Sequence, residues 1–227
     1  MLPPRQYEAL TTALGLSDSG TPVPAGCRYS ASVPISFDTG RMQQVDNATW
    51  RDPRTGDMVN VTYFGLVPDL PAPLEDLTTL RRRLAERSAE NGCLIEAFVV
   101  WLDAQPALLR MEKLPLPNQP QGLVFAASVI VPKADSSAVL QILCPESGTT
   151  GVREAVLATE IGFDNMYPPH PYAPEVRGRL PFTMADDIRW DAKFPDHPLS
   201  RARRWIAHTV PTARLAPEFA ALPPFAG

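Results

Sequence analysis

The stretch between residues 94 and 144 constrains the fold of this chain more than any other part of the sequence. It contains four runs of apolar, β-branched and aromatic residues, 94–102, 107–114, 123–131 and 139–144. The connections between these runs are short and rich in turn residues. Parallel strands need a crossover of about a dozen residues or more, and no helical pattern interrupts this stretch. The sequence therefore predicts an antiparallel meander.

Two further features add strands on the N-terminal side. The β-type runs Met42–Trp50 and Met58–Val67 flank the segment 51–57, which combines Asp-Pro with Gly. We expect a β-hairpin here, because proline fixes φ and glycine accepts a positive φ. The alternating run Arg28–Phe37 predicts another strand, which Pro34 would place at an edge or a bulge. The sheet should therefore have about six or seven strands.

Helical spacing recurs along the chain. Residues 5–15 could form a short helix, and the leucines within residues 73–91 predict a longer one that ends at Asn91-Gly92. Another helix should follow Gly151, and a third should begin at Pro198, because proline suits the first helical position. The fold class is therefore α+β, an antiparallel sheet with helices packed on it.

The chain has 227 residues, and chains divide into domains only beyond roughly 250 residues. We expect residues 1–227 to form a single α+β domain. Within it, residues 163–227 should form a proline-rich loop and a C-terminal helical extension that packs on the sheet.

Composition excludes several partners. The net charge of −4 argues against nucleic acid, which needs a basic surface. The longest apolar run, 123–132, has about half of the roughly 20 residues of a membrane span, and the N-terminus lacks the pattern of a signal peptide. We therefore expect a cytoplasmic protein. Arginine far outnumbers lysine and proline is abundant, which favours a GC-rich bacterial source.

The cysteines and histidines predict neither a disulfide framework nor a metal site. Cys27, Cys93 and Cys144 are odd in number and far apart, so we expect small buried side chains. No Cys-x-x-Cys, close Cys/His pair or His-x-x-x-His pattern supplies metal ligands. We therefore expect no metal and no cofactor.

Two groups of residues could still carry chemistry. Asp191, Asp196 and His197 could surround a pocket and perform acid–base work on a small molecule. The alternative is a solvated loop in which the carboxylates pair with neighbouring basic residues and His197 caps a helix. Gly148-Thr149-Thr150-Gly151 could bind an anion at a helix start, or it could be a plain turn after which Arg153 and Glu154 form a buried pair.

The segment 177–214 is basic and contains interleaved aromatic residues. It could dock an acidic partner, or it could be an amphipathic helix that covers one face of the sheet. The residues expected to form a binding surface in this part of the chain are Arg153, Asp196, His197, Arg201, Arg204 and Trp205. The sequence identifies no catalytic residue.

The order of hairpin, helix, antiparallel strands and helix resembles the PsbP-like fold group, which includes DcrB-like chaperones. The likeness rests on Ser32-Val33-Pro34-Ile35, the segment Pro68–Leu84 and the strands from 94 to 144, and it covers roughly residues 28–160. The chain departs from that group in its long tail and in lacking a lipobox. The resemblance implies binding to other proteins and carries over no catalytic residue.

The sequence thus favours a non-enzymatic, cytoplasmic protein-interaction module, such as an adaptor, an effector chaperone or an immunity-type protein. An enzyme that acts on a small molecule through Asp191, Asp196 and His197 is the first alternative. A homo-oligomeric structural protein is the second, because exposed sheet edges pair readily.

Overall fold

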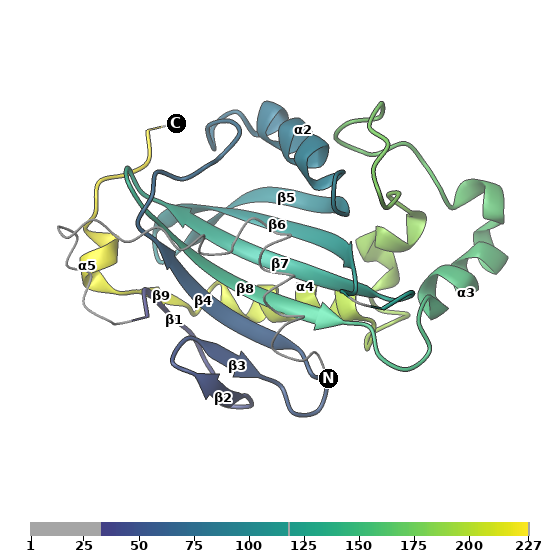
Figure 1. Ribbon diagram of the computed structural model, residues 1–227, viewed down its shortest axis with the longest axis horizontal. Coiled ribbons are helices and arrows are strands. Elements are labelled where there is room, and N and C mark those ends of the chain that lie inside the picture. The colour runs from purple at the N-terminus through teal and green to yellow at the C-terminus, as the bar shows by residue number, and fades with distance from the viewer. Residues whose placement is uncertain (1–32, 118, 227) are drawn as a thin grey trace.

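The computed structural model describes residues 33–117 and 119–226, and it contains an extended antiparallel sheet (Figure 1). Seven strands pair in the order β2-β3-β4-β8-β7-β6-β5, and every neighbouring pair is antiparallel. The strands are β2 (Gln43–Asp46), β3 (Thr49–Arg51), β4 (Met58–Phe64), β5 (Cys93–Leu102), β6 (Gln105–Pro115), β7 (Leu123–Pro132) and β8 (Ser137–Pro145). The predicted α+β fold is therefore confirmed, as is the meander that residues 94–144 predict.

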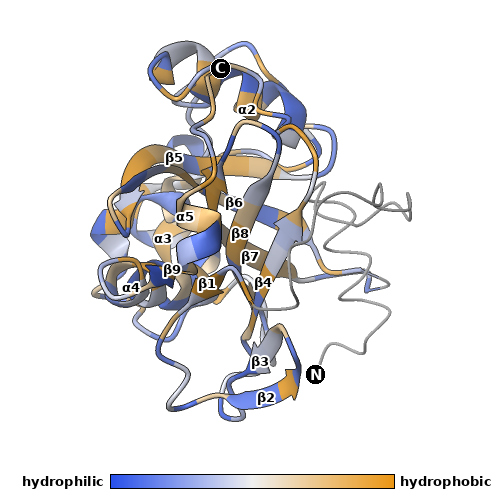
Figure 2. Ribbon diagram, turned by 90° about the vertical axis from the view of Figure 1, so that its left-hand side faces the viewer, coloured by the Kyte–Doolittle hydropathy of each residue, from blue (hydrophilic) through white to orange (hydrophobic). Residues whose placement is uncertain are grey.

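Helices cover both faces of this sheet. They are α2 (Leu77–Ser88), α3 (Val152–Ile161), α4 (Pro198–Thr209) and α5 (Pro217–Ala220). Leu80 and Leu84 of α2 belong to one apolar cluster, which includes Val124 of β7. Ile206 of α4 belongs to a second cluster with Phe125, the next residue of β7. Successive side chains of a strand point to opposite faces, so a strand that is covered on both faces is apolar throughout. Figure 2 shows this as orange along the central strands, in contrast to the largely hydrophilic β2.

The N-terminal hairpin forms at the predicted turn, but its first strand is shorter than expected. Between β3 and β4, the Asp52 amide donates to Asp57 O over 2.8 Å, and Gly56 has a φ of 77°. The predicted run Met42–Trp50 is divided into β2 and β3, which pair with each other. The carboxylate of Asp46 accepts a hydrogen bond from the Ala48 amide over 2.8 Å and forms a turn that competes with the strand.

The helix that was predicted over 73–91 is shorter, because a side chain caps it at Asp76. The Asp76 carboxylate accepts a hydrogen bond from the Thr79 amide over 3.1 Å, so the helix begins at Leu77. Leu74, which fits the helical spacing, lies before the helix and is buried in the same apolar cluster. Spacing alone does not distinguish a buried residue in the helix from one just before it.

The C-terminal third packs back on the sheet through short elements. It contains three single-turn 3₁₀ helices, η1 (Phe163–Asn165), η2 (Met184–Asp186) and η3 (Ile188–Trp190). Strand β9 (Arg214–Leu215) pairs with β1 (Ile35–Ser36) in a separate two-stranded sheet. The strand predicted over 28–37 is therefore limited to 35–36 among its described residues 33–37, and it does not join the seven-stranded sheet as expected. Phe219 is fully buried, and Lys133 Nζ donates to the Ala220 carbonyl over 2.9 Å. The predicted helix over 5–15 and Cys27 lie outside the described residues.

The proline-rich stretch 167–174 is irregular, as predicted, but it does not lie wholly at the surface. His170 and Ala173 are buried. His170 Nε2 lies 2.8 Å from the carbonyl oxygen of Leu94, at the free edge of β5. This imidazole therefore satisfies a backbone group that the strand could not pair.

Candidate functional site

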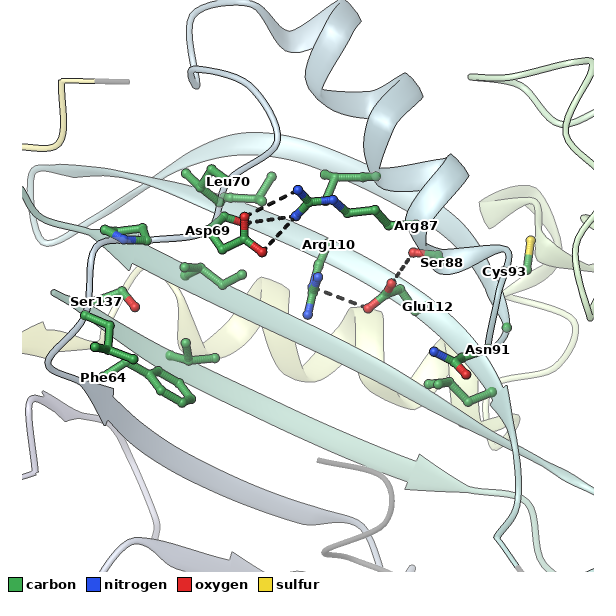
Figure 3. Close-up of a pocket in the computed structure, with 18 of the residues that line it drawn as sticks. Phe64, Asp69, Leu70, Arg87, Ser88, Asn91, Cys93, Arg110, Glu112 and Ser137 are labelled. Carbon is green, nitrogen blue, oxygen red and sulfur yellow. Dashed lines mark hydrogen bonds and ion pairs between the residues drawn. The ribbon is translucent and has the colours of Figure 1, made fainter. Parts of the chain in front are cut away.

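A pocket of about 430 Å³ lies between α2, the segment 66–70 and the strands β6, β7 and β8 (Figure 3). Its apolar lining includes Leu84 of α2, Leu108 of β6 and Val139 of β8. The segment 66–70 connects β4 to α2 and forms one wall. Pockets that bind ligands usually have volumes of roughly 300–1,000 Å³ and a mostly apolar lining with a few polar groups.

Three polar side chains lie together inside this pocket (Figure 3). Arg110 and Glu112 are two residues apart on β6, so both point to the face that carries α2. Arg110 Nε lies 3.3 Å from Glu112 Oε2, and Ser88 Oγ donates a hydrogen bond to Glu112 Oε1. The side chains of Arg110 and Glu112 are only 14% and 7% exposed. A molecule in this pocket would therefore contact an ion pair that is largely shielded from water.

Part of the rim of the pocket consists of apolar, solvent-exposed side chains. Leu66 and Val67 are 63% and 68% exposed, although both are large aliphatic residues. An ion pair of 3.2 Å between Arg87 and Asp69 connects α2 to the same segment. Exposed apolar residues that adjoin a pocket are typical of an interaction site, whereas such residues scattered singly need no explanation.

The residues predicted at the start of α3 and in the C-terminal third form mostly structural contacts. Arg153 is buried and donates to Asp191 Oδ1 over 3.0 Å, to Ser200 Oγ over 2.9 Å and to the Asp187 carbonyl over 2.9 Å. Arg203 donates to the same oxygen of Asp191 over 2.9 Å. The carboxylate that pairs with Arg153 is thus that of Asp191, and the expected pair with Glu154 does not form.

The other predicted binding residues are divided between packing and solvent. Arg201 donates to both carboxylate oxygens of Asp57, over 2.9 and 2.7 Å. Burial opposes the charge of Arg201, but these hydrogen bonds raise its pKa. Trp205 is half-buried, with its ring 5.8 Å from that of Phe37. Asp196 and Arg204 are exposed.

His197 caps α4, as one sequence interpretation suggested, and it also faces a second pocket. Its Nδ1 accepts a hydrogen bond from the Leu199 amide over 3.3 Å. Burial, and then the charges of Arg153 and Arg201, lower its pKa to about 3. The second pocket has about 340 Å³ and includes Asp196 in its lining. The carboxylate of Asp191 points to the arginines instead, as described above.

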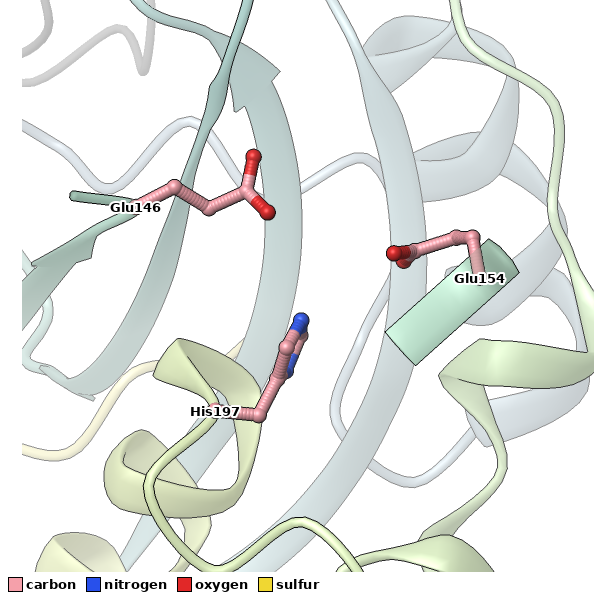
Figure 4. A group of neighbouring side chains, drawn as sticks. All are labelled: Glu146, Glu154 and His197. Carbon is pink, nitrogen blue, oxygen red and sulfur yellow. The ribbon is translucent and has the colours of Figure 1, made fainter. Parts of the chain in front are cut away.

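The side chains that meet His197 are Glu146 and Glu154 (Figure 4). Sequence reasoning missed both as partners of His197, because the three residues belong to three separate elements and their spacing matches no ligand motif. One sequence feature could have indicated the pocket below α2, namely the charged residues within strand β6. Arg110, Glu112 and Lys113 interrupt a largely apolar strand, and charges in a buried strand indicate a polar site.

The two described cysteines are buried, as the sequence predicted. Cys93 is 4% exposed and Cys144 is fully buried. Burial raises the pKa of Cys93 to about 12 and that of Cys144 well above its ordinary value. Nucleophilic cysteines need the thiolate, so neither residue suits that role at neutral pH.

Comparison with known proteins adds no family to this description. No model of a protein family matches the chain, and no curated protein matches it. Within residues 33–117 and 119–226, no helix has both the length and the apolar character that crossing a membrane requires.

Proposed function

We propose that this chain is a cytoplasmic bacterial protein-interaction module that receives a hydrophobic segment of another protein in the pocket below α2. The observation that carries this proposal is the apolar rim formed by Leu66 and Val67 beside that pocket. A small ligand inside the pocket would contact Leu66 and Val67, which belong to its lining, but would leave much of their exposed surface in water. A protein partner would cover them while one of its side chains fills the pocket, as the anchors of protein interfaces do.

The polar groups of the pocket suit binding better than proton transfer. Glu112 already pairs with Arg110 and accepts a hydrogen bond from Ser88, so its charge is compensated. Such a pair can hold a polar group next to the apolar anchor of a partner. An adaptor, an effector chaperone or an immunity-type protein would use a pocket in this way.

The order of elements supports the same proposal. The hairpin β3–β4, helix α2, strands β5–β8 and helix α3 follow one another as the resemblance to the PsbP-like group implies. Membership in that group remains part of the proposal. If it holds, binding to another protein is the role that the resemblance implies.

The proposal is tested by affinity purification from the source cells with quantitative mass spectrometry. The double variant Leu66→Asp/Val67→Asp should lose a partner that the wild type recovers, with affinity falling at least about tenfold, because each buried aliphatic side chain contributes about 1.5–3 kcal/mol. The matched control is Val45→Asp, since Val45 is also 57% exposed but lies on β2. A wild-type chain without a reproducible partner, or a partner that the double variant retains, would contradict the proposal.

Self-association along β5 is the second candidate function. Arg81 Nε donates to the Ala97 carbonyl over 2.7 Å, so that carbonyl points away from β6. By alternation, the backbone groups of Val99 and Trp101 also point outward, and Trp101 is 67% exposed. A second copy could extend the sheet at this edge. Sedimentation velocity decides the point, because a monomer at every concentration rules out this candidate.

A further inference from the structure

Glu146, Glu154 and His197 converge from three elements on one small space (Figure 4). Glu146 directly follows β8, Glu154 lies in the first turn of α3, and His197 is the N-cap of α4. Each residue offers one ligand atom, and the three atoms lie within 4.8 Å of one another. We propose that these three side chains form a binding site for a divalent transition metal ion, for which Zn²⁺ is the fitting probe.

Two buried polar atoms at this site lack a hydrogen-bond partner among the residues that the structure describes. They are His197 Nε2 and Glu154 Oε2. Buried polar atoms without partners are rare, and each calls for an explanation such as a bound ion or water. A metal ion between these atoms would give both of them a ligand bond at once.

The charges around the site leave room for a cation. The nearby cations are balanced by carboxylates: Lys113 pairs with Asp186, Arg153 with Asp191, Arg203 with both Glu96 and Asp191, and Arg201 with Asp57. Glu146 and Glu154 take part in no ion pair with the other residues in the described part of the chain. Two carboxylates and an imidazole then suit an ion of charge +2.

The positions of the ligand atoms suit a zinc ion after a small adjustment. Ligand atoms lie about 2.0–2.2 Å from zinc, so any two of them are at most about 4.4 Å apart. Tetrahedral ligands of zinc are about 3.4 Å apart, so atoms that lie up to 4.8 Å apart would have to close by up to about 1.4 Å, chiefly through rotation of the Glu154 side chain. The Glu146 carboxylate also accepts hydrogen bonds from the amides of Leu123 and Gly151, over 2.8 and 3.0 Å. These bonds fix its position and leave a lone pair on each oxygen for the metal.

Metal binding at His197 Nε2 would require the hydrogen bond at His197 Nδ1 to break. A metal on His197 Nε2 requires the ring proton on Nδ1, so the Leu199 amide would lose its acceptor. That bond is long, at 3.3 Å, so little is lost when it breaks. The alternative occupant is a water molecule, which would keep this bond and accept from Nε2–H.

The adjoining pocket of about 340 Å³ indicates what kind of metal site this would be. Glu146 and His197 belong to its lining, together with Thr149 and Phe194. Three protein ligands would leave at least one position of the ion open towards this pocket. Structural zinc sites have four protein ligands, whereas sites that bind water or an exchangeable ligand have three. Because the imidazole favours transition metals, Mg²⁺ and Ca²⁺ should bind much more weakly.

The test is calorimetric titration of the full-length chain with ZnCl₂, after treatment with a chelator and under reducing conditions. Wild type should bind one Zn²⁺ per chain. Glu154→Gln and His197→Asn should each weaken binding at least tenfold, and asparagine retains a cap acceptor for α4. His208→Asn is the matched control, because His208 is an exposed histidine of the same helix.

Circular dichroism confirms that each variant is folded. Co²⁺ gives an independent reading, since a bound ion of low coordination number absorbs strongly in the visible range. Absence of saturable Zn²⁺ binding, as expected if water occupies the site, overturns the proposal. So does wild-type binding by both folded variants, which would place the ion elsewhere. Neither result bears on the partner proposed for the pocket below α2.

Discussion

Replacing Asp191 by alanine should strongly destabilise the fold. One carboxylate oxygen of Asp191 accepts hydrogen bonds from Arg153 over 3.0 Å, from Ser200 over 3.0 Å and from Arg203 over 2.9 Å. The side chain of Arg153 is fully buried and that of Arg203 is 7% exposed. The substitution therefore removes the countercharge of two guanidinium groups that have little access to water.

The size of the destabilisation depends on the hydrogen-bond and ion-pair partners that Arg153 and Arg203 keep after the substitution. Arg203 keeps its ion pair with Glu96 and a hydrogen bond to the Asp186 carbonyl. Arg153 keeps hydrogen bonds to neutral partners but loses the carboxylate that neutralises it. Removing one partner of a buried ion pair costs about 3–5 kcal/mol, because the remaining charge is uncompensated. We expect Asp191→Ala to lower the free energy of unfolding by an amount near the lower end of this range.

Urea denaturation followed by far-ultraviolet circular dichroism measures this loss. A double-mutant cycle with Arg153→Met isolates the pair, and we expect a coupling of about 1–3 kcal/mol. Asp196→Ala is the matched control, because Asp196 is exposed and its loss should change stability by no more than about 0.5 kcal/mol. The reasoning is refuted if Asp191→Ala lies within about 1 kcal/mol of wild type, or if the two substitutions are additive.

Two further predictions concern His197 and Gly92. Burial lowers the pKa of His197 to about 3, against about 6.5 when unfolded, so below pH ~6.5 the unfolded chain binds the proton more readily. The free energy of unfolding should therefore decrease as the pH is lowered from about 6 to about 4. The decrease should be steeper in wild type than in His197→Asn, by up to about 1.4 kcal/mol per pH unit. Equal slopes for the two proteins in urea denaturation would contradict this prediction. In Gly92→Ala, the new Cβ would lie 2.2 Å from the Lys113 carbonyl oxygen, so a loss of about 2 kcal/mol or more is expected. In Gly148→Ala the new Cβ would meet no atom within 4 Å, so the loss of stability should be only about 1–2 kcal/mol, caused by the φ of 70°. The prediction fails if Gly148→Ala destabilises the protein more than Gly92→Ala does.

Sequence patterns predicted most elements of the fold because each pattern acts over a few residues. The apolar runs of residues 94–144 predicted four strands, and Pro198 predicted the start of α4. Where these predictions missed, another local interaction had prevailed. The Asp46 carboxylate formed a turn inside an expected strand, and Asp76 capped α2 several residues later than the leucine spacing suggested.

The candidate sites could not be predicted in the same way. His197 was singled out, but its partners Glu146 and Glu154 were not, because they come from a strand end and another helix. The pocket below α2 likewise combines a connecting segment with strands that lie far from it in sequence. No local pattern encodes such distances.

The sequence by itself thus determined the antiparallel meander, the hairpin turn and the helices on the sheet, since periodicity and turn chemistry restrict φ and ψ locally. The tertiary structure alone decided which charges are buried together. Arg153 pairs with Asp191, thirty-eight positions away, and Glu146 lies near His197, although α3 and three 3₁₀ helices separate them in the sequence. Such pairs depend on strand register and on how the helices pack, and these are properties of the whole fold.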